Sequence, residues 1–226
     1  MQNVLFEDLK DIEYKKAWDY QEHLMQTIQE QKKNEESTIH HKLLFCEHPN
    51  VYTLGKSGTE NNLLINDEFL KKINASYFKS NRGGDITYHG PGQIVGYPIF
   101  DLEQFGFLVK NYIYKLEDAI INTIAKYGIS GTRLEGATGV WLDTNKPGKT
   151  RKICAMGVRV SRWVTMHGFA LNVNTDLNYF NHINPCGFVD KGVTSMEKEL
   201  GEKLNFEDVK KELKIQIAKE FQLQYI

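Results

Sequence analysis

Apolar residues along this chain follow a helical period in some stretches and form short, strand-like runs in others. Helices are predicted over residues 10–33, 67–73 and 107–127. Strands are predicted over residues 42–45, 51–54, 94–100, 139–143, 153–160 and 169–173. The last three strands follow one another closely, so an antiparallel meander is expected there.

Two further helices are predicted near the C-terminus from their capping residues. Thr194–Glu197 has the form of a capping box and opens a short helix that ends at Gly201. Asn205 is the expected N-cap of a final amphipathic helix. Helices beside mixed or antiparallel sheets make this an α/β (α+β) protein. We expect a large catalytic lobe over residues 1–175 and a smaller C-terminal lobe over residues 176–226.

The composition indicates a compact globular protein and narrows its partners. The chain has 226 residues, with 28 Lys and Arg against 29 Asp and Glu, a formal net charge of −1 and 41% hydrophobic residues. The hydrophobic share is large enough to form a core. The near-zero net charge argues against a dedicated nucleic-acid binder, which would be strongly basic. No apolar run reaches the roughly 18 residues of a membrane span, and the N-terminus lacks the apolar region of a signal peptide. We therefore expect a soluble, cytoplasmic protein with no nucleic-acid or membrane partner.

The three cysteines raise the question of a reactive thiol. Cys46, Cys154 and Cys186 are odd in number and form no C-x-x-C pair, so neither a disulfide framework nor a metal site is expected. Cys46 and Cys154 lie on apolar strands, where a cysteine usually packs as a small hydrophobic residue. Cys186 lies in a loop between Pro185 and Gly187, where neighbouring amides can serve as an oxyanion hole. Cys186 is therefore the candidate nucleophile.

The stretch Arg82–Gln93 is the densest in glycine and polar side chains. Glycines let the backbone approach a ligand closely, and the Arg, Thr, Tyr and His side chains supply hydrogen-bond donors. The pattern alone favours a ligand loop and an ordinary glycine-rich hairpin equally. His89 alone is more typical of a structural histidine.

Two other glycine motifs do not predict a nucleotide site. Gly148–Thr150 looks like the end of a phosphate-binding loop, but Asp143 stands where that motif needs glycine. Residues 90–96 come within one residue of the dinucleotide fingerprint, but they precede a strand instead of opening a helix.

Several short blocks occur in a fixed order over about two-thirds of the chain, from residue 47 to residue 196. They are Glu47–Pro49, Tyr52–Gly55, Arg82–Gln93 with Tyr97, Lys152-Ile153, Gly157–Val160, His167–Val173, Ile183–Gly187 and Gly192–Ser195. In this order they resemble the lipoyl(octanoyl) transferases of lipoate biosynthesis. Those enzymes move an octanoyl group from acyl carrier protein to a lipoyl domain.

The resemblance implies a single catalytic domain with the fold of biotin and lipoate protein ligases. It also implies a covalent thioester on Cys186 with Lys152 as its partner, and no cofactor. The substrate-binding residues that it implies are Arg82, Gly83, Gly84, Asp85, Ile86, Thr87, Tyr88, His89, Ala155, Met156, Gly157, Gly168, Phe169 and Ala170. The chain departs from the family pattern at Gly136–Gly139, which lacks an expected proline, at Met166, which replaces a common histidine, and in a longer 144–150 turn.

The implied partners are octanoyl-acyl carrier protein as donor, and lipoyl domains of 2-oxoacid dehydrogenase complexes or the glycine cleavage H protein as acceptors. Such carrier proteins are acidic. Six basic residues, with no acidic residue among them, form what we call the basic strip: Lys146, Lys149, Arg151, Lys152, Arg159 and Arg162. We expect the strip to steer docking, with a solvated hairpin as the equal alternative.

The two implied catalytic groups suit the chemistry. A lysine ammonium beside a thiol favours the thiolate, which is the nucleophilic form. Acylation removes that negative charge, and we expect desolvation then to let Lys152 release a proton and act as base for the incoming amine. Four alternatives stay open: an ATP-dependent lipoate or biotin protein ligase, an amidotransferase between lipoyl domains, a non-catalytic carrier-protein-binding module, and a Cys–His hydrolase using His89 or His167.

Overall fold

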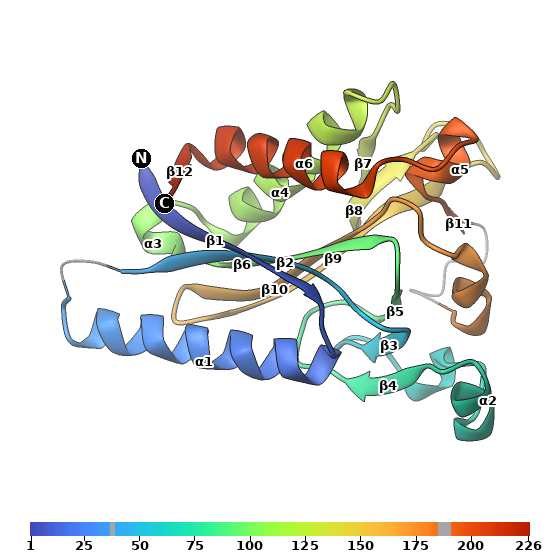
Figure 1. Cartoon of the computed structure of the whole chain (residues 1–226), viewed down its shortest axis with the longest axis horizontal. Helices are drawn as coiled ribbons and strands as arrows, with labels where there is room; N and C mark the ends of the chain where they lie inside the picture. Colours follow the sequence, from blue (N-terminus) through green and yellow to red (C-terminus); the bar gives the residue numbers. More distant parts are fainter. Residues whose placement is uncertain (37–38, 185–190) are drawn as a thin grey trace.

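The computed structural model describes residues 1–36, 39–184 and 191–226 (Figure 1). The strands are β1 (Gln2–Asp11), β2 (His41–Glu47), β3 (Val51–Leu54), β4 (Ser76–Lys79), β5 (Ile86–His89), β6 (Gln93–Ile99), β7 (Thr132–Leu134), β8 (Ala137–Leu142), β9 (Arg151–Ser161), β10 (Val164–Asn172), β11 (Gly192–Val193) and β12 (Leu223–Tyr225). The helices are α1 (Tyr14–Lys33), α2 (Asp67–Lys72), α3 (Leu102–Phe105), α4 (Val109–Ala125), α5 (Met196–Leu200) and α6 (Phe206–Phe221), with short 3-10 helices η1 (Glu60–Asn62) and η2 (Leu177–His182).

The strands form a large mixed sheet and a small one. The large sheet has the order β12-β1-β2-β6-β10-β9-β8-β7, and β11 pairs alongside β9. The small sheet has the order β4-β3-β5. Helices α4 and α6 cover one face of the large sheet and α1 covers the other (Figure 1). The predicted α/β (α+β) class is confirmed.

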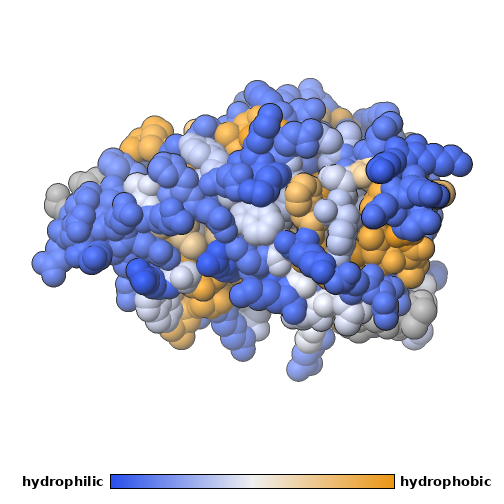
Figure 2. Space-filling model, turned by 90° about the horizontal axis from the view of Figure 1, so that it is seen from below, coloured by the Kyte–Doolittle hydropathy of each residue, from blue (hydrophilic) through white to orange (hydrophobic). Residues whose placement is uncertain are grey.

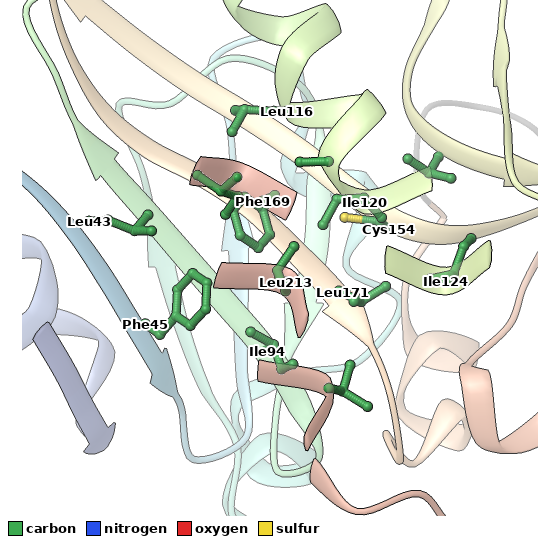
Figure 3. Close-up of a cluster of buried hydrophobic side chains, with 14 of the residues drawn as sticks. Leu43, Phe45, Ile94, Leu116, Ile120, Ile124, Cys154, Phe169, Leu171 and Leu213 are labelled. Carbon is green, nitrogen blue, oxygen red and sulfur yellow. The ribbon is translucent and has the colours of Figure 1, made fainter. Parts of the chain in front are cut away.

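The central strands β2, β6 and β10 of the large sheet are buried on both faces, which explains why they are largely apolar runs without a polar alternation. On β2, Leu43 and Phe45 face the core under α4 and α6, which also holds Phe169 and Leu213 (Figure 3). The intervening residues Leu44 and Cys46 face the core under α1, because successive side chains of a strand point to opposite faces. The outer side of the molecule near α1 and the small sheet is mostly hydrophilic (Figure 2).

Most predicted elements are present, with three differences. The helices predicted at 10–33, 67–73 and 107–127 are α1, α2 and α4, and the meander is β8, β9 and β10. The first strand, β1, was not predicted, since Glu7, Asp8 and Lys10 interrupt its apolar pattern. The short elements β4, β5, β7, β11, β12 and α3 were not predicted either. The runs at 42–45 and 51–54 are strands, but they belong to different sheets.

The third difference concerns the capping box near the C-terminus. The N-cap of α5 is Ser195, whose hydroxyl accepts the Lys198 amide, one residue later than the box predicts. Gly201 ends α5, and Asn205 caps α6 through the Glu207 and Asp208 amides, as predicted.

The residues after 175 contact the large sheet and its helices at several places. Helix α6 packs against α4, β12 pairs with β1, and β11 pairs with β9. The division into lobes at residue 175 stays a prediction.

Candidate active site

A cavity of about 540 Å³ lies between the small sheet, the 82–85 loop and strands β6, β8, β9 and β10 of the large sheet. This volume is in the range of small-molecule sites, about 300–1,000 Å³. The residues predicted at the site that line it are Arg82, Gly83, Gly84, Asp85, Ile86, Thr87, His89, Lys152, Ala155, Met156, Gly157, Gly168, Phe169 and Ala170. Side chains from distant parts of the sequence complete the wall, among them Tyr14, Gln93, Tyr97, Trp141, His167 and Asn172.

Tyr88 differs from the other predicted substrate-binding residues. It lies between Thr87 and His89 on β5, so its side chain points to the opposite face of the strand. There its hydroxyl donates to Asn50 Oδ1 at 2.7 Å and its ring stacks on Tyr179, with centroids 4.9 Å apart. The structure therefore places Tyr88 in the core of the small sheet and not on the cavity wall.

The candidate nucleophile Cys186 lies outside the described residues, but both flanks of its segment are placed. On the N-terminal side, the Asn184 amide donates to the Asn62 carbonyl oxygen at 2.8 Å. On the C-terminal side, Gly192 and Val193 form β11 and pair with Arg151 and Lys152. The C-terminal flank, residues 191–193, lines the cavity.

Lys152 lies near the start of β9, and its side chain lines the cavity. Its ammonium nitrogen is 4.5 Å from the centre of the Trp141 ring. Its carbonyl oxygen accepts the Thr194 amide at 2.9 Å, which ties the lysine to the segment directly after β11. The chain thus brings Lys152 next to the C-terminal flank of the segment that carries Cys186.

The other two cysteines pack in the core, as predicted. Cys46 and Cys154 are both buried, and burial raises the pKa of each thiol. A thiol with a raised pKa holds little thiolate near neutral pH and is a poor nucleophile.

Arg82 organises the glycine-rich loop. Its side chain is 7% exposed, and its guanidinium donates to the carbonyl oxygens of Thr53, Gly83 and Asp85 and to the Thr53 hydroxyl. These contacts are with Thr53 and with the backbone of the loop, and a role of Arg82 toward a ligand stays a prediction. Its planar fork matches several acceptors at once, which a lysine cannot do.

Glycines let the loop lie directly against its neighbours. A Cβ on Gly157 would lie 2.6 Å from the Gly83 carbonyl oxygen, and a Cβ on Gly55 would lie 2.2 Å from the Gly84 carbonyl oxygen. Gly84 itself has a φ of 84°, which favours glycine. These close contacts join backbone segments that frame the cavity, and the predicted approach to a ligand stays a prediction.

A buried hydrogen-bonded chain runs behind the cavity from His89 toward Lys152. His89 Nδ1 donates to Gln93 Oε1 at 2.8 Å, and Gln93 Nε2 donates to Asn172 Oδ1 at 2.8 Å. Asn172 Nδ2 then donates to the Thr194 carbonyl oxygen at 3.0 Å. These hydrogen bonds link the small sheet and the large sheet to Thr194, whose amide donates to the Lys152 carbonyl oxygen.

The three most buried histidines near the cavity are neutral. Burial is the main cause that lowers the pKa of His48 to about 4 and that of His89 and His167 to about 3. His48 Nδ1 donates to the Ile12 carbonyl oxygen, so its Nε2 accepts from the Tyr97 hydroxyl at 2.7 Å. A base with so low a pKa is inefficient near neutral pH. This disfavours a Cys–His hydrolase that uses His89 or His167.

The basic strip is partly neutralised. Lys146 pairs with Asp143 at 2.7 Å, and Arg151 pairs with both Asp143 and Glu199. Asp143 precedes the strip in sequence, and Glu199 comes from α5. Exposed Lys149 is a better candidate for steering a partner than Arg151 is.

Within residues 1–36, 39–184 and 191–226, no group of three or more His, Cys, Asp or Glu side chains is arranged to hold a metal ion. No helix in the same part of the chain is long and apolar enough to cross a membrane.

Comparison with known proteins defines the class. The chain belongs to the family of the lipoyl protein ligase A/B catalytic domain, whose model matches residues 13–218. Its fold is similar to that of a bipartite lipoate protein ligase from Thermoplasma acidophilum, with a TM-score of 0.70 at 12% identity over 100% of this chain and 86% of that one. It is also similar to a biotin protein ligase from Aquifex aeolicus, with a TM-score of 0.51 at 11% identity over 98% of this chain and 69% of that one. The expected fold is confirmed.

Nearer relatives narrow the class. The chain is 53% identical to an octanoyltransferase of Bacteroides fragilis, over 91% of this chain and 92% of the relative. It is 55% identical to an octanoyltransferase of Flavobacterium psychrophilum, over 93% of each. The resemblance stated from the sequence motifs is thereby confirmed.

Proposed function

We propose that this protein is a cytoplasmic octanoyltransferase of lipoate biosynthesis. It moves an octanoyl group from acyl carrier protein to a lysine of a lipoyl domain, through a thioester on Cys186. The observation that carries the proposal is the 53% identity to an octanoyltransferase over 91% of the chain. The placement of Lys152 at a cavity beside the flank of the Cys186 segment supports it.

The first half-reaction moves the acyl group from one sulfur to another. The Cys186 thiolate, stabilised by the Lys152 ammonium, attacks the thioester carbonyl carbon of octanoyl-carrier protein. A carbon–sulfur bond to the enzyme forms and the bond to the carrier sulfur breaks. Lys152, which holds the proton of the Cys186 thiol as an ammonium group, passes it to the released carrier sulfur, so the acyl-enzyme is neutral at its sulfur and Lys152 is left as an amine.

The second half-reaction forms the amide. The amine of the lipoyl-domain lysine attacks the acyl-enzyme carbonyl, a carbon–nitrogen bond forms, and the carbon–sulfur bond to Cys186 breaks. Lys152, deprotonated after losing its counter-charge, accepts the proton from the attacking nitrogen. The donor is already a thioester, so the sequence of steps requires no ATP.

The test is intact-mass spectrometry after mixing the protein with octanoyl-carrier protein and no ATP. The expected result is an octanoyl adduct that peptide mapping places on Cys186, and that disappears when a lipoyl domain is added. Cys186→Ser should form no thioester adduct, whereas Cys46→Ala, a matched change at a buried thiol, should keep it. An adduct that requires ATP, or none on Cys186, contradicts the proposal.

The second candidate is an ATP-dependent ligase acting through an acyl-adenylate. The likeness of the fold to a lipoate protein ligase is the observation in its favour. Because an adenylate needs no cysteine, Cys186→Ser would retain acyl transfer from free octanoate and ATP. Transfer to a lipoyl domain under those conditions separates the two candidates. An amidotransferase is distinguished by its donor, since it would take the acyl group from an octanoylated lipoyl domain.

A further inference from the structure

Trp141 lies beside Lys152 on the cavity wall, and the steps above give it no role. The two residues are directly opposite each other on the antiparallel strands β8 and β9. The Lys152 ammonium nitrogen is 4.5 Å from the ring centre, and both side chains line the cavity. The electron-rich face of an aromatic ring attracts a cation at this distance. The indole is therefore a partner of the ammonium group.

A register shift in the sheet creates this pair. Val140 pairs with Cys154 and Trp141 pairs with Lys152, so Ile153 is an extra residue on β9 between the two pairs. Without the shift, Trp141 would lie opposite Ile153, which is buried in the core. Such bulges re-aim side chains and are frequent beside active sites.

Gly139 and a buried carboxylate hold the backbone next to the shift. Gly139 has a φ of 121°, and a Cβ there would lie 2.5 Å from the Cys154 carbonyl oxygen, so glycine alone fits. The Gly139 amide donates to Glu117 Oε1 at 2.9 Å. The indole nitrogen of Trp141 donates to the Ala137 carbonyl oxygen at 2.8 Å, and the residue is 2% exposed. The ring is thus fixed before a substrate arrives.

We infer that Trp141 is a positioning residue for Lys152: its indole face holds the lysine side chain at the cavity and favours the ammonium form. In the first half-reaction the ammonium stabilises the thiolate. In the second, Lys152 must be an amine to accept a proton. Trp141 thereby sets the pH at which Lys152 changes from one role to the other. This consequence for catalysis rests on the proposed function, whereas the effect of the ring on the ammonium does not.

A chemical titration tests the effect of the ring without catalysis. Only the neutral amine of a lysine reacts with acetic anhydride, so brief acetylation over a series of pH values, read by peptide mass spectrometry, gives the ionisation midpoint of Lys152. We expect Trp141→Leu to lower this midpoint by roughly one pH unit, the size of effect for a desolvated cation–π contact. Trp141→Phe keeps an aromatic face and should shift it by less than half as much. Exposed Lys16 serves as an internal reference whose midpoint stays constant.

An unchanged Lys152 midpoint in Trp141→Leu, or equal shifts in the Leu and Phe variants, overturns the inference. Thermal unfolding checks that both variants are folded. Trp141→Met supplies a second variant without a ring if Trp141→Leu does not fold.

Single-turnover kinetics tests the catalytic consequence. Octanoyl-enzyme is prepared first and then mixed with a lipoyl domain at several pH values. Trp141→Leu should move the acid limb of the rate profile to lower pH by the same amount as the chemical midpoint, and Trp141→Phe should leave it nearly in place. A rate that falls equally at every pH indicates a structural role only and overturns the inference. If the wild-type protein takes up no octanoyl group, the proposed function fails, and the acetylation midpoint still decides on Trp141.

Discussion

Acidification should destabilise this fold through three buried histidines. His48 has a folded-state pKa of about 4, and His89 and His167 have values of about 3, with burial as the main cause of each depression. In the unfolded chain each ring has an ordinary pKa of about 6.5. Between the folded-state pKa values and about 6.5, the unfolded state therefore binds more protons than the folded state does. The stability that the three neutral rings contribute is fully present above a pH of about 6.5 and decreases as the pH falls below it.

Neighbouring charges act mostly in the same direction as burial. At His89 the largest of these charges is that of His48, followed by Arg82 and His167, and all three lower its pKa. At His167, Arg82 and then Arg159 lower the pKa, whereas Asp11 opposes the depression at His48. Arginine and aspartate do not titrate between pH 5 and 7 in their ordinary range, so the change in this pH range comes from the histidine rings.

The expected magnitude follows from proton linkage. Between pH 7 and pH 5, protonation of the unfolded chain costs the folded state about 2 kcal/mol for each ring, or about 6 kcal/mol for the three. This is a large share of the 5–15 kcal/mol that typically stabilises a domain. With a urea dependence of about 3 kcal/mol per molar, the unfolding midpoint should fall by about 2 M.

Urea unfolding followed by circular dichroism at pH 7, 6 and 5 measures this loss. His167→Asn is the informative variant, because His167 has a φ of 58°, which asparagine tolerates. The variant should lose about 2 kcal/mol less than the wild type between pH 7 and pH 5. Exposed His23→Asn is the matched control and should lose as much as the wild type. Equal urea midpoints at pH 7 and pH 5, or an undiminished loss in His167→Asn, would refute the linkage argument.

Two further predictions concern the buried chain and the basic strip. Gln93→Leu removes one hydrogen bond each from His89 Nδ1, the Tyr88 carbonyl oxygen and Asn172 Oδ1, and should lower the free energy of unfolding by about 3–5 kcal/mol. Exposed Gln26→Leu is the control, and a loss below about 1 kcal/mol in Gln93→Leu contradicts the prediction. Lys149→Glu should weaken binding of octanoyl-carrier protein at low salt and have little effect at high salt. Exposed Lys33→Glu is its control, and unchanged affinity in Lys149→Glu at low salt rejects docking at the strip.

The sequence was most informative where the backbone itself is constrained. The glycines of the 82–93 stretch predict a close approach to a ligand, which stays a prediction. The structure shows close approach between backbone segments: a Cβ on Gly92 would lie 2.5 Å from the Asn174 carbonyl oxygen, and side chains at Gly55 and Gly157 would collide with the loop. Lys152 was placed at the site only through the family resemblance, since a lysine at a strand end is usually solvated. Residues 82–89 were predicted as one binding block, but the two-residue period of β5 turns the Tyr88 side chain away from the cavity.

Residues that reach the cavity from distant elements could not be recognised in the same way. Tyr14 fits the helical period of α1 and looks like a core position; it lines the cavity because α1 crosses the face of the large sheet. Trp141 is one apolar residue in an apolar strand, and its place opposite Lys152 depends on a register shift that no local pattern reveals. Glu117 similarly appears as a charge on a helix, although its carboxylate is buried against Gly139.

The charges placed around the cavity suit the proposed role of Lys152. The Arg82 guanidinium binds backbone carbonyl oxygens in the loop, and the buried histidines stay neutral down to about pH 4. Neither Arg82 nor these histidines therefore changes its charge near neutral pH, where Lys152 is proposed to exchange a proton. Since the same burial makes the unfolded chain the better proton acceptor, we expect acid to remove activity by unfolding the protein before it protonates the cavity wall.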